Sequence, residues 1–182
     1  MDCFNLKRRK LLIGGTAALS MALLPNTAKA LLTISHPRSL TMSNLHTGET
    51  LRTEFFNGKH YDQNELTRLN YFFRDYRANL TKSIDPSLFD QIYLLQTLLE
   101  TRKTIQLISG YRSLVTNNIL HNRSSGVAKH SYHTKGRAMD FYIEGVKLSD
   151  IRKIALKMCA GGVGYYPRSN FVHIDTGPVR HW

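Results

Sequence analysis

The chain has 182 residues, a formal net charge of +12 and only two cysteines. This length supports one domain with a hydrophobic core and is short for two, and two cysteines exclude a fold held by several disulfides. The basic balance is typical of nucleic-acid binders, of binders of other anionic partners and of ordinary basic proteins, so charge alone does not identify the partner.

Residues 1–30 have the three-part layout of a cleaved export signal. Residues 7–10 are all basic, residues 11–24 are apolar, and the stretch ends in Ala-Lys-Ala. The paired Arg8-Arg9 indicates the twin-arginine route of bacteria. The alternative is an uncleaved membrane anchor, but the apolar run of about 14 residues is shorter than the roughly 20 that span a bilayer.

Cleavage near Ala30 would release a single domain, residues 31–182, into the periplasm, with the twin-arginine translocase as its partner during export. We expect no stable membrane span in this mature chain. The signal carries five basic residues and one acidic residue, so its removal lowers the net charge from +12 to +8. An exported basic protein points to an anionic envelope polymer or membrane surface and away from nucleic acid. Cys159 would then be the sole cysteine, and we interpret it as a small buried residue at a helix end.

The first elements expected in the mature chain are a β-hairpin and two helices. Residues 38–45 and 49–56 flank the turn sequence HTGE and predict the hairpin. A helix is predicted over 62–77, where an Asp–Glu capping-box pair stands at the start, and another over 85–100, with Pro in its first turn. The apolar stripes that these helices would bury are Leu66, Leu69, Phe73 and Tyr76 on the first and Phe89, Ile92, Leu95 and Leu99 on the second.

Strands dominate the second half of the chain. The elements expected there are a strand at 104–109, a short helix at 116–120, a polar loop at 121–136, a strand at 137–143, a helix that Ser149 caps and that runs to Met158, and two strands at 163–166 and 170–175. The order predicts an α+β fold, with an antiparallel sheet and helices packed on one face.

Two of these strands carry an apolar face and a face with ionisable groups, because successive side chains of a strand point to opposite sides. The apolar members are Met139, Phe141 and Ile143 in the first strand and Val172 and Ile174 in the second. Asp140 lies on the other face of the first strand, and His173 and Asp175 lie on the other face of the second. If the two strands are neighbours, Asp140 and His173 converge over the sheet.

His133, in the polar loop, completes a candidate metal site on the face opposite the helices. We expect Gly136 to act as the hinge that returns His133 over Asp140. Two imidazoles and one carboxylate suit zinc and leave a fourth position for water, as in catalytic sites. On the residues alone, hydrogen-bonded structural histidines are the alternative.

The spacing Ser-x-His-x-x-Gly-x-Ala-x-Asp over residues 131–140 resembles the signature of a zinc peptidase superfamily. Its members include the lysostaphin-type endopeptidases, the D-alanyl-D-alanine metallopeptidases and the hedgehog signalling domains. The segment SGYRS, residues 109–113, is similar to one in the D-alanyl-D-alanine enzymes, and FVHID, residues 171–175, supplies a third ligand. The whole mature chain looks most similar to the twin-arginine-exported murein endopeptidases of enteric bacteria.

The resemblance implies one zinc ion held by His133, Asp140 and His173, and hydrolysis of a peptide bond in peptidoglycan stem peptides. Zinc polarises a scissile carbonyl and lowers the pKa of bound water. By the same resemblance Arg112 lies beside the substrate and stabilises developing negative charge, a role that suits a guanidinium group. The alternative is a structural arginine that pins its loop.

Further candidates for substrate binding lie in the loop and on a late strand. Ser131 is expected either to hydrogen-bond the substrate or to shape the loop. Tyr132, Tyr165 and Tyr166 are expected either to line the groove or to pack.

The sequence departs from the family at the general base. Many relatives carry a second histidine or an acidic residue at the positions held here by Phe171 and Asn170. Asp175 is our first substitute as the base, and the alternative is that it orients a ligand histidine. His181 and His130 are weaker candidates, and a zinc-activated water that needs no protein base is a further possibility.

These observations predict a periplasmic zinc-dependent murein endopeptidase that cuts diaminopimelate–diaminopimelate links, D-alanine–diaminopimelate links, or both. The missing base keeps open a second class, a zinc-stabilised module that binds peptidoglycan without cutting it. A D-alanyl-D-alanine carboxypeptidase acting through the same site is a third possibility.

Overall fold

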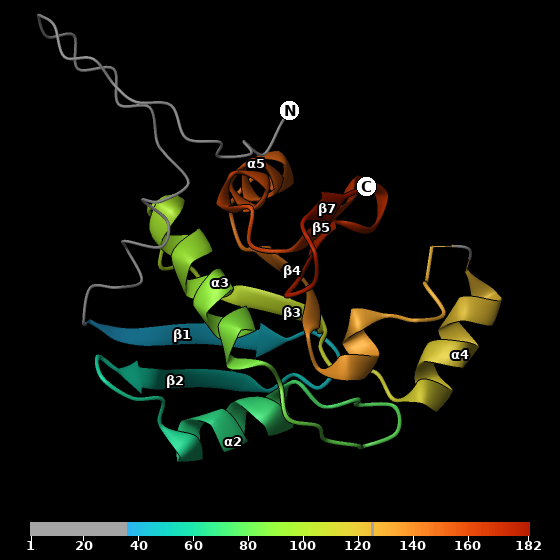
Figure 1. Ribbon diagram of the computed structural model, residues 1–182, viewed down its shortest axis with the longest axis horizontal. Coiled ribbons are helices and arrows are strands. Elements are labelled where there is room, and N and C mark those ends of the chain that lie inside the picture. Colours follow the sequence, from blue (N-terminus) through green and yellow to red (C-terminus); the bar gives the residue numbers. More distant parts are fainter. Residues whose placement is uncertain (1–35, 125) are drawn as a thin grey trace, which may run out of the picture.

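The structure is a computed structural model that describes residues 36–124 and 126–182. Its centre is one sheet with the strand order β2-β1-β3-β4-β6-β5-β7 (Figure 1). The strands are β1 (Pro37–Asn44), β2 (Thr50–Asn57), β3 (Ile105–Ser109), β4 (Ala138–Ile143), β5 (Gly162–Tyr166), β6 (Phe171–Asp175) and β7 (Arg180–His181). The helices are α2 (Gln63–Phe72), α3 (Pro86–Leu98), α4 (Leu114–Arg123) and α5 (Leu148–Met158), with short 3-10 helices η1 (Tyr132–Lys135) and η2 (Pro167–Ser169).

The α+β class is confirmed, but the sheet is mixed and not purely antiparallel as expected. β1 pairs with β2, β3 with β4, and β6 with both β4 and β5 in antiparallel fashion. β1 and β3 are parallel, and so are β5 and β7. The first parallel pair arises because β2, α2 and α3 intervene between its strands, and such a long connection returns the chain in the same direction.

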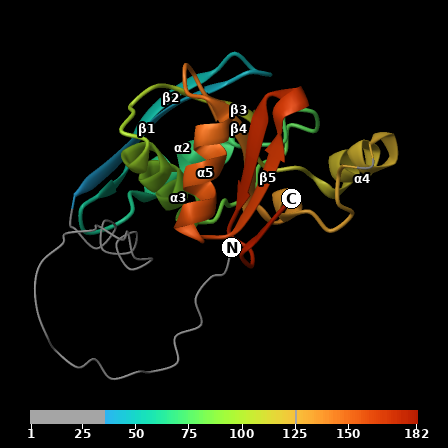
Figure 2. The ribbon, with the colours of Figure 1, turned by 90° about the horizontal axis from the view of Figure 1, so that it is seen from above.

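One hydrophobic core joins the sheet to the helices. Met139, Phe141 and Ile143 of β4 lie in this core together with Phe89 of α3 and Ile151 of α5. The strand alternation therefore places the side chain of Asp140 on the opposite face of β4. Helix α4 stands away from the sheet in both views (Figures 1 and 2).

Helix α2 ends at Phe72 and does not continue to residue 77 as expected. The side chain of Asp75 accepts hydrogen bonds from the backbone N–H groups of Arg77 and Ala78, at 3.1 and 3.4 Å, and so turns the chain. Tyr76 is consequently outside the helix and stacks on His46, with ring centroids 4.3 Å apart.

Two expectations about α5 were wrong. Lys147, without a side-chain cap, precedes the helix, and Ser149 lies inside its first turn. Cys159 is exposed, because the helix ends there and this residue takes a left-handed conformation, with φ 47°.

Strand β7 was not expected from the sequence. It forms because the tail after β6 folds back beside β5, where Gly162 pairs with Arg180.

The predicted export signal, residues 1–30, lies outside the described residues. Within residues 36–124 and 126–182, no helix combines the length and the apolar character needed to cross a membrane.

Candidate metal centre

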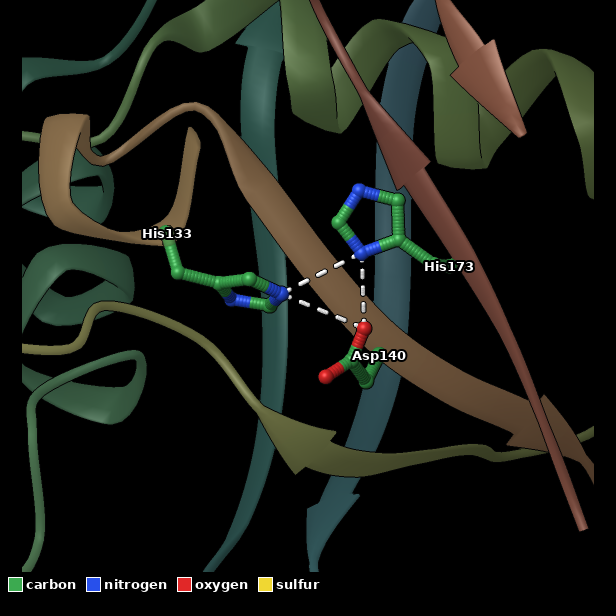
Figure 3. A group of neighbouring side chains, drawn as sticks. All are labelled: His133, Asp140 and His173. Carbon is green, nitrogen blue, oxygen red and sulfur yellow. Dashed lines mark hydrogen bonds and ion pairs between the residues drawn. The ribbon is translucent and has the colours of Figure 1, made fainter. Parts of the chain in front are cut away.

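Three ionisable side chains from three different elements point at one another (Figure 3). His133 comes from η1, Asp140 from β4 and His173 from β6, and Asp140 and His173 are directly paired residues of neighbouring strands. Nε2 of His133 lies 3.2 Å from both Oδ1 of Asp140 and Nδ1 of His173. Nδ1 of His173 lies 2.8 Å from Oδ1 of Asp140. All three residues are buried.

The short helix η1 presents His133 because its two ends are fixed. Oγ of Ser131 accepts a hydrogen bond from the backbone N–H of His133 at 3.3 Å and so caps the helix. Gly136 ends it with φ 67°, and a Cβ at this residue would collide with the carbonyl oxygen of Ser83. Only glycine satisfies both conditions at this turn. The carbonyl of Gly136 also accepts a hydrogen bond from the N–H of Asp85 at 2.9 Å.

The tautomer of His133 follows from its partner. Nδ1 lies 2.6 Å from the carbonyl oxygen of Gly110, which can only accept, so Nδ1 carries the proton and Nε2 presents its lone pair. Burial, followed by the positive charge of Arg112, lowers the pKa of His133 to about 4. His133 is therefore neutral near pH 7, which is the form that binds metals.

His173 is oriented in the same way by a carboxylate. Its Nε2 lies 3.1 Å from Oδ2 of Asp175, so Nε2–H donates there and Nδ1 faces the other two donor atoms. Burial alone would lower the pKa of His173, but its hydrogen bonds with Asp140 and Asp175 outweigh burial and raise the pKa.

Asp175 is completely buried and already has several partners. Its oxygens accept hydrogen bonds from Nη2 and Nη1 of Arg180, at 2.6 and 3.0 Å. They also accept from the backbone N–H groups of Gly162 and Gly177, at 3.1 and 2.8 Å. Burial raises the pKa of this carboxyl, and the hydrogen bonds from His173 and Arg180 more than reverse that effect, so the pKa lies well below its usual value.

Arg112 holds the other oxygen of Asp140. Its Nη2 donates to Oδ2 of Asp140, and its Nε donates to Oγ of Ser109 at 2.8 Å. Burial raises the pKa of Asp140, but the neighbouring His133 and Arg112 hold it well below the usual value. Asp140 is thus a carboxylate whose Oδ1 is left to face the two imidazoles.

The donor set fits a divalent zinc ion. With the tautomers above, three lone pairs meet at 2.8–3.2 Å, an arrangement that repels unless a proton or cation lies between them. Zinc–ligand bonds of about 2.0–2.1 Å in tetrahedral geometry place ligand atoms about 3.3 Å apart, close to these separations. The remaining imidazole nitrogens donate to a backbone carbonyl and a carboxylate, which is the usual support of metal-bound histidines.

The predicted substrate-binding residues have mainly structural contacts. Ser131 caps η1, as described above. The guanidinium carbon of Arg180 lies 4.9 Å from the centroid of the Tyr132 ring. A Cβ at Gly177 would collide with the same ring. Arg152 covers Tyr165, at 4.9 Å from the ring centroid, and Tyr165 packs against the core. The hydroxyl oxygen of Tyr166 accepts a hydrogen bond from the indole N–H of Trp182 at 2.6 Å.

The positions at which relatives carry a base hold side chains that cannot replace it. Asn170 is exposed and takes a left-handed conformation, with φ 56°, which asparagine tolerates. Phe171 stacks on Tyr166, with ring centroids 4.5 Å apart. His130 and His181, the weaker candidates, are both exposed.

Two residues at the site were not expected from the sequence. Arg180 pairs with Asp175, and Trp182 lies with its ring centroid 5.3 Å from that of His173. A signal for Trp182 was present, since β5 has Gly164 opposite His173, and a Cβ there would lie 2.8 Å from the indole. A glycine inside a strand indicates a close approach by another group.

Comparisons with known proteins identify the family of the chain. The profile of the family Peptidase_M15_2, described as peptidoglycan L,D-endopeptidase MepK, matches residues 33–182. The chain belongs to this family. It is therefore a peptidase, and the resemblance to the metallopeptidases that cut peptidoglycan is confirmed.

Relatives match over the full length of the chain. The peptidoglycan L,D-endopeptidase MepK of Escherichia coli K12 is 68% identical over 182 residues, which is all of both chains. The probable peptidoglycan L,D-endopeptidase MepK of Haemophilus influenzae is 45% identical over 183 residues, covering all of this chain and 98% of the relative. No solved structure gives a significant match.

Proposed function

We propose that this protein is a zinc-dependent murein endopeptidase that hydrolyses peptide cross-links in peptidoglycan. The observation that carries the proposal is the convergence of three lone pairs from His133, Asp140 and His173 at 2.8–3.2 Å. The names of the relatives support the substrate, because they are peptidoglycan L,D-endopeptidases. An L,D bond is the type that joins two diaminopimelates, so this link is the expected target before the D-alanine–diaminopimelate link.

The three residues would hold one zinc ion, and the bound ion would polarise the scissile carbonyl and lower the pKa of water at the open position. The protein prepares the site in advance. Gly110 and Asp175 fix the protons of the two imidazoles on the nitrogens that face away from the centre. His133, whose pKa is lowered to about 4, is neutral near pH 7 and does not have to lose a proton from Nε2 or rotate before it binds.

Asp175 acts in this proposal as a positioning residue and not as the general base. A base must be able to take a proton from water within hydrogen-bond reach. Oδ2 of Asp175 faces His173 and Arg180, and Oδ1 faces Arg180 and two backbone N–H groups. These partners occupy both oxygens and stabilise the deprotonated form.

The main role of Arg112 in this proposal is to orient the carboxylate of Asp140. Its Nη2 holds Oδ2 of Asp140 and thereby aims Oδ1 at the imidazoles. The two bonds of Arg112, to Asp140 and Ser109, fix the guanidinium plane beside the centre. The charge-stabilising role implied by the family resemblance would need a nitrogen that these bonds leave available.

We infer that the enzyme works outside the cytoplasm. Its proposed substrate is a cell-wall polymer, and residues 1–30 have the pattern of a twin-arginine signal. The mature chain, residues 31–182, keeps a formal net charge of +8. A positive charge favours approach to stem peptides, which carry several carboxylates.

Digestion of isolated murein tests the function. The purified protein is incubated with murein, with and without a chelator, and the muropeptides are then separated. The proposal predicts loss of cross-linked dimers, which the chelator abolishes and added zinc restores. Binding to murein with an unchanged muropeptide profile would instead support the binding module. Removal of terminal D-alanine from monomers, with the dimers intact, would support a carboxypeptidase.

Two variants link that activity to the site. His133→Ala removes one of the three donors, so both zinc binding and dimer cleavage should be lost. His130→Ala changes an exposed histidine three residues away and should leave both unchanged. Cleavage by His133→Ala at the wild-type rate would refute the assignment of the site.

A further inference from the structure

Trp182 is a large exposed aromatic residue beside the metal centre. Its ring centroid lies 5.3 Å from that of His173, at an interplanar angle of 49°. The residue is nevertheless 47% exposed. Neither the proposed metal site nor the orientation of its ligands uses this side chain.

Trp182 is held in place by hydrogen bonds, although residues in a tail that follows the last long strand are ordinarily poorly ordered. Its backbone N–H donates to the carbonyl of Val163 at 3.2 Å, and its carbonyl accepts from the N–H of Tyr165 at 3.1 Å. Nε1–H of the indole donates to the hydroxyl oxygen of Tyr166 at 2.6 Å. Gly164 lies beneath the indole and leaves room for it.

The neighbours of the indole form a continuous aromatic surface. Tyr166 contacts Trp182 through its hydroxyl and stacks on Phe171 at 4.5 Å between centroids. The guanidinium group of Arg180 lies 5.1 Å from the centroid of Trp182 and pairs with Asp175. Phe171, Tyr166 and Trp182 therefore form a row of aromatic side chains, and the ring of Trp182 lies beside that of His173.

An exposed indole that is fixed by hydrogen bonds is well suited to binding. A rigid aromatic ring offers a large contact area and loses little conformational entropy when a ligand covers it. A tryptophan that served only to fill space would be expected to lie in the core, where its surface would be removed from water.

We propose that Trp182 is a substrate-positioning residue, which contacts the aliphatic side-chain arm of a diaminopimelate residue at the scissile cross-link. This inference rests on the proposed function. The arm of diaminopimelate is a chain of methylene groups that leads from the peptide backbone to a free carboxylate, so it matches an apolar ring beside the basic Arg180. The hydroxyl of Tyr166 sets the plane of the indole.

Steady-state kinetics with a soluble cross-linked muropeptide dimer test the role. An aromatic contact contributes about 0.5–1.5 kcal/mol, so Trp182→Leu should raise KM about two- to twelvefold. We expect kcat and zinc affinity to stay within twofold of wild type, and Trp182→Phe to restore part of the loss. If Trp182 only supports His173, zinc affinity falls and KM stays unchanged, and this result would overturn the proposal.

Fluorescence gives a readout that does not depend on turnover, because Trp182 is the sole tryptophan of the chain. A monomeric stem tetrapeptide is titrated into the zinc-loaded protein with excitation of the indole. We expect a blue shift of the emission and protection from acrylamide quenching, since the peptide covers the ring. Saturating peptide without either change would refute the contact.

A matched control uses Tyr71, another exposed aromatic residue, on α2 and 52% exposed. Tyr71→Leu should leave KM unchanged. The outcomes separate the two proposals. If wild-type protein cleaves no dimers, the proposed function fails. If it cleaves them and Trp182→Leu has the wild-type KM, only the role of Trp182 fails.

Discussion

The imidazole of His173 is fixed by Asp175, whose Oδ2 lies 3.1 Å from Nε2. This contact turns the opposite nitrogen, Nδ1, toward Asp140. The sequence left two roles open for Asp175, base or orienting carboxylate, and the contact favours the second because both of its oxygens are already occupied.

Replacement of Asp175 by asparagine separates these roles. Asp175→Asn should weaken zinc binding about 10- to 100-fold, which is typical for a partner of a metal-bound histidine. Competition with a chelating dye measures the affinity, and excess zinc should recover much of the cleavage rate. Glu144→Gln, at an exposed acidic residue, is the control. Full zinc binding with a lost rate would identify Asp175 as the base after all.

Arg112 is predicted to act through Asp140. Arg112→Lys keeps a positive charge but cannot reach Asp140 and Ser109 together, so zinc affinity should fall about tenfold. At saturating zinc the rate should return to within a few-fold of wild type. Arg74→Lys is the control, because Arg74 pairs with Glu49 and contacts none of the three proposed zinc ligands. It should leave the zinc affinity unchanged. A rate that stays about 100-fold low at saturating zinc would show direct stabilisation of charge instead.

Much of the site could be predicted because its residues lie in regular patterns. The alternation of side chains along β4 places Asp140 on the face opposite Met139 and Phe141. The alternation along β6 likewise places His173 on the face opposite the apolar residues of that strand. Gly136 could be identified as a turn because glycine adopts positive φ without strain. Its φ in the structure is 67°.

The missed features depend on individual contacts that the pattern of residue types does not record. The carbonyl of Gly110 orients His133 from 23 residues away, and backbone groups leave no trace in composition. Asp75 ends α2 through a local side-chain bond that competes with helix periodicity. The tail carrying Arg180 and Trp182 is too short to predict as a strand, and only its pairing with β5 makes it one.

Gly136 should be far more sensitive to substitution than Gly48, although both have positive φ, 67° and 70°. Gly48 has open space around it, so Gly48→Ala should cost only the strain of about 1 kcal/mol. Gly136→Ala adds the collision with Ser83 and should cost about 3 kcal/mol. Urea unfolding of the zinc-free proteins measures both, and equal losses would contradict the role of the close approach.

Acid should weaken the loop that carries Arg112 through the titration of Asp75. Burial raises the pKa of this carboxyl, but hydrogen bonds from Thr116 and Ser113 more than offset burial and lower it below 3.8. A carboxyl with a lowered folded pKa stabilises the protein above its unfolded pKa, and this contribution is lost as the pH falls through the folded value.

The loss of free energy of unfolding caused by Asp75→Asn should therefore be largest near pH 7 and shrink below about pH 4. Urea unfolding at pH 7 and pH 3 measures it. Asp150→Asn, at an exposed residue of α5, controls for the lost charge. A loss for Asp75→Asn that is the same at both pH values would contradict this role.

The most direct measurement is a titration of zinc into the chelated protein, with bound zinc and the rate of dimer cleavage recorded together. If His133, Asp140 and His173 hold a catalytic zinc ion, the rate rises in proportion to bound zinc and stops rising at one zinc per chain, and His133→Ala neither binds zinc at this site nor cleaves. Cleavage of dimers at the full rate by the zinc-free protein would contradict this assignment.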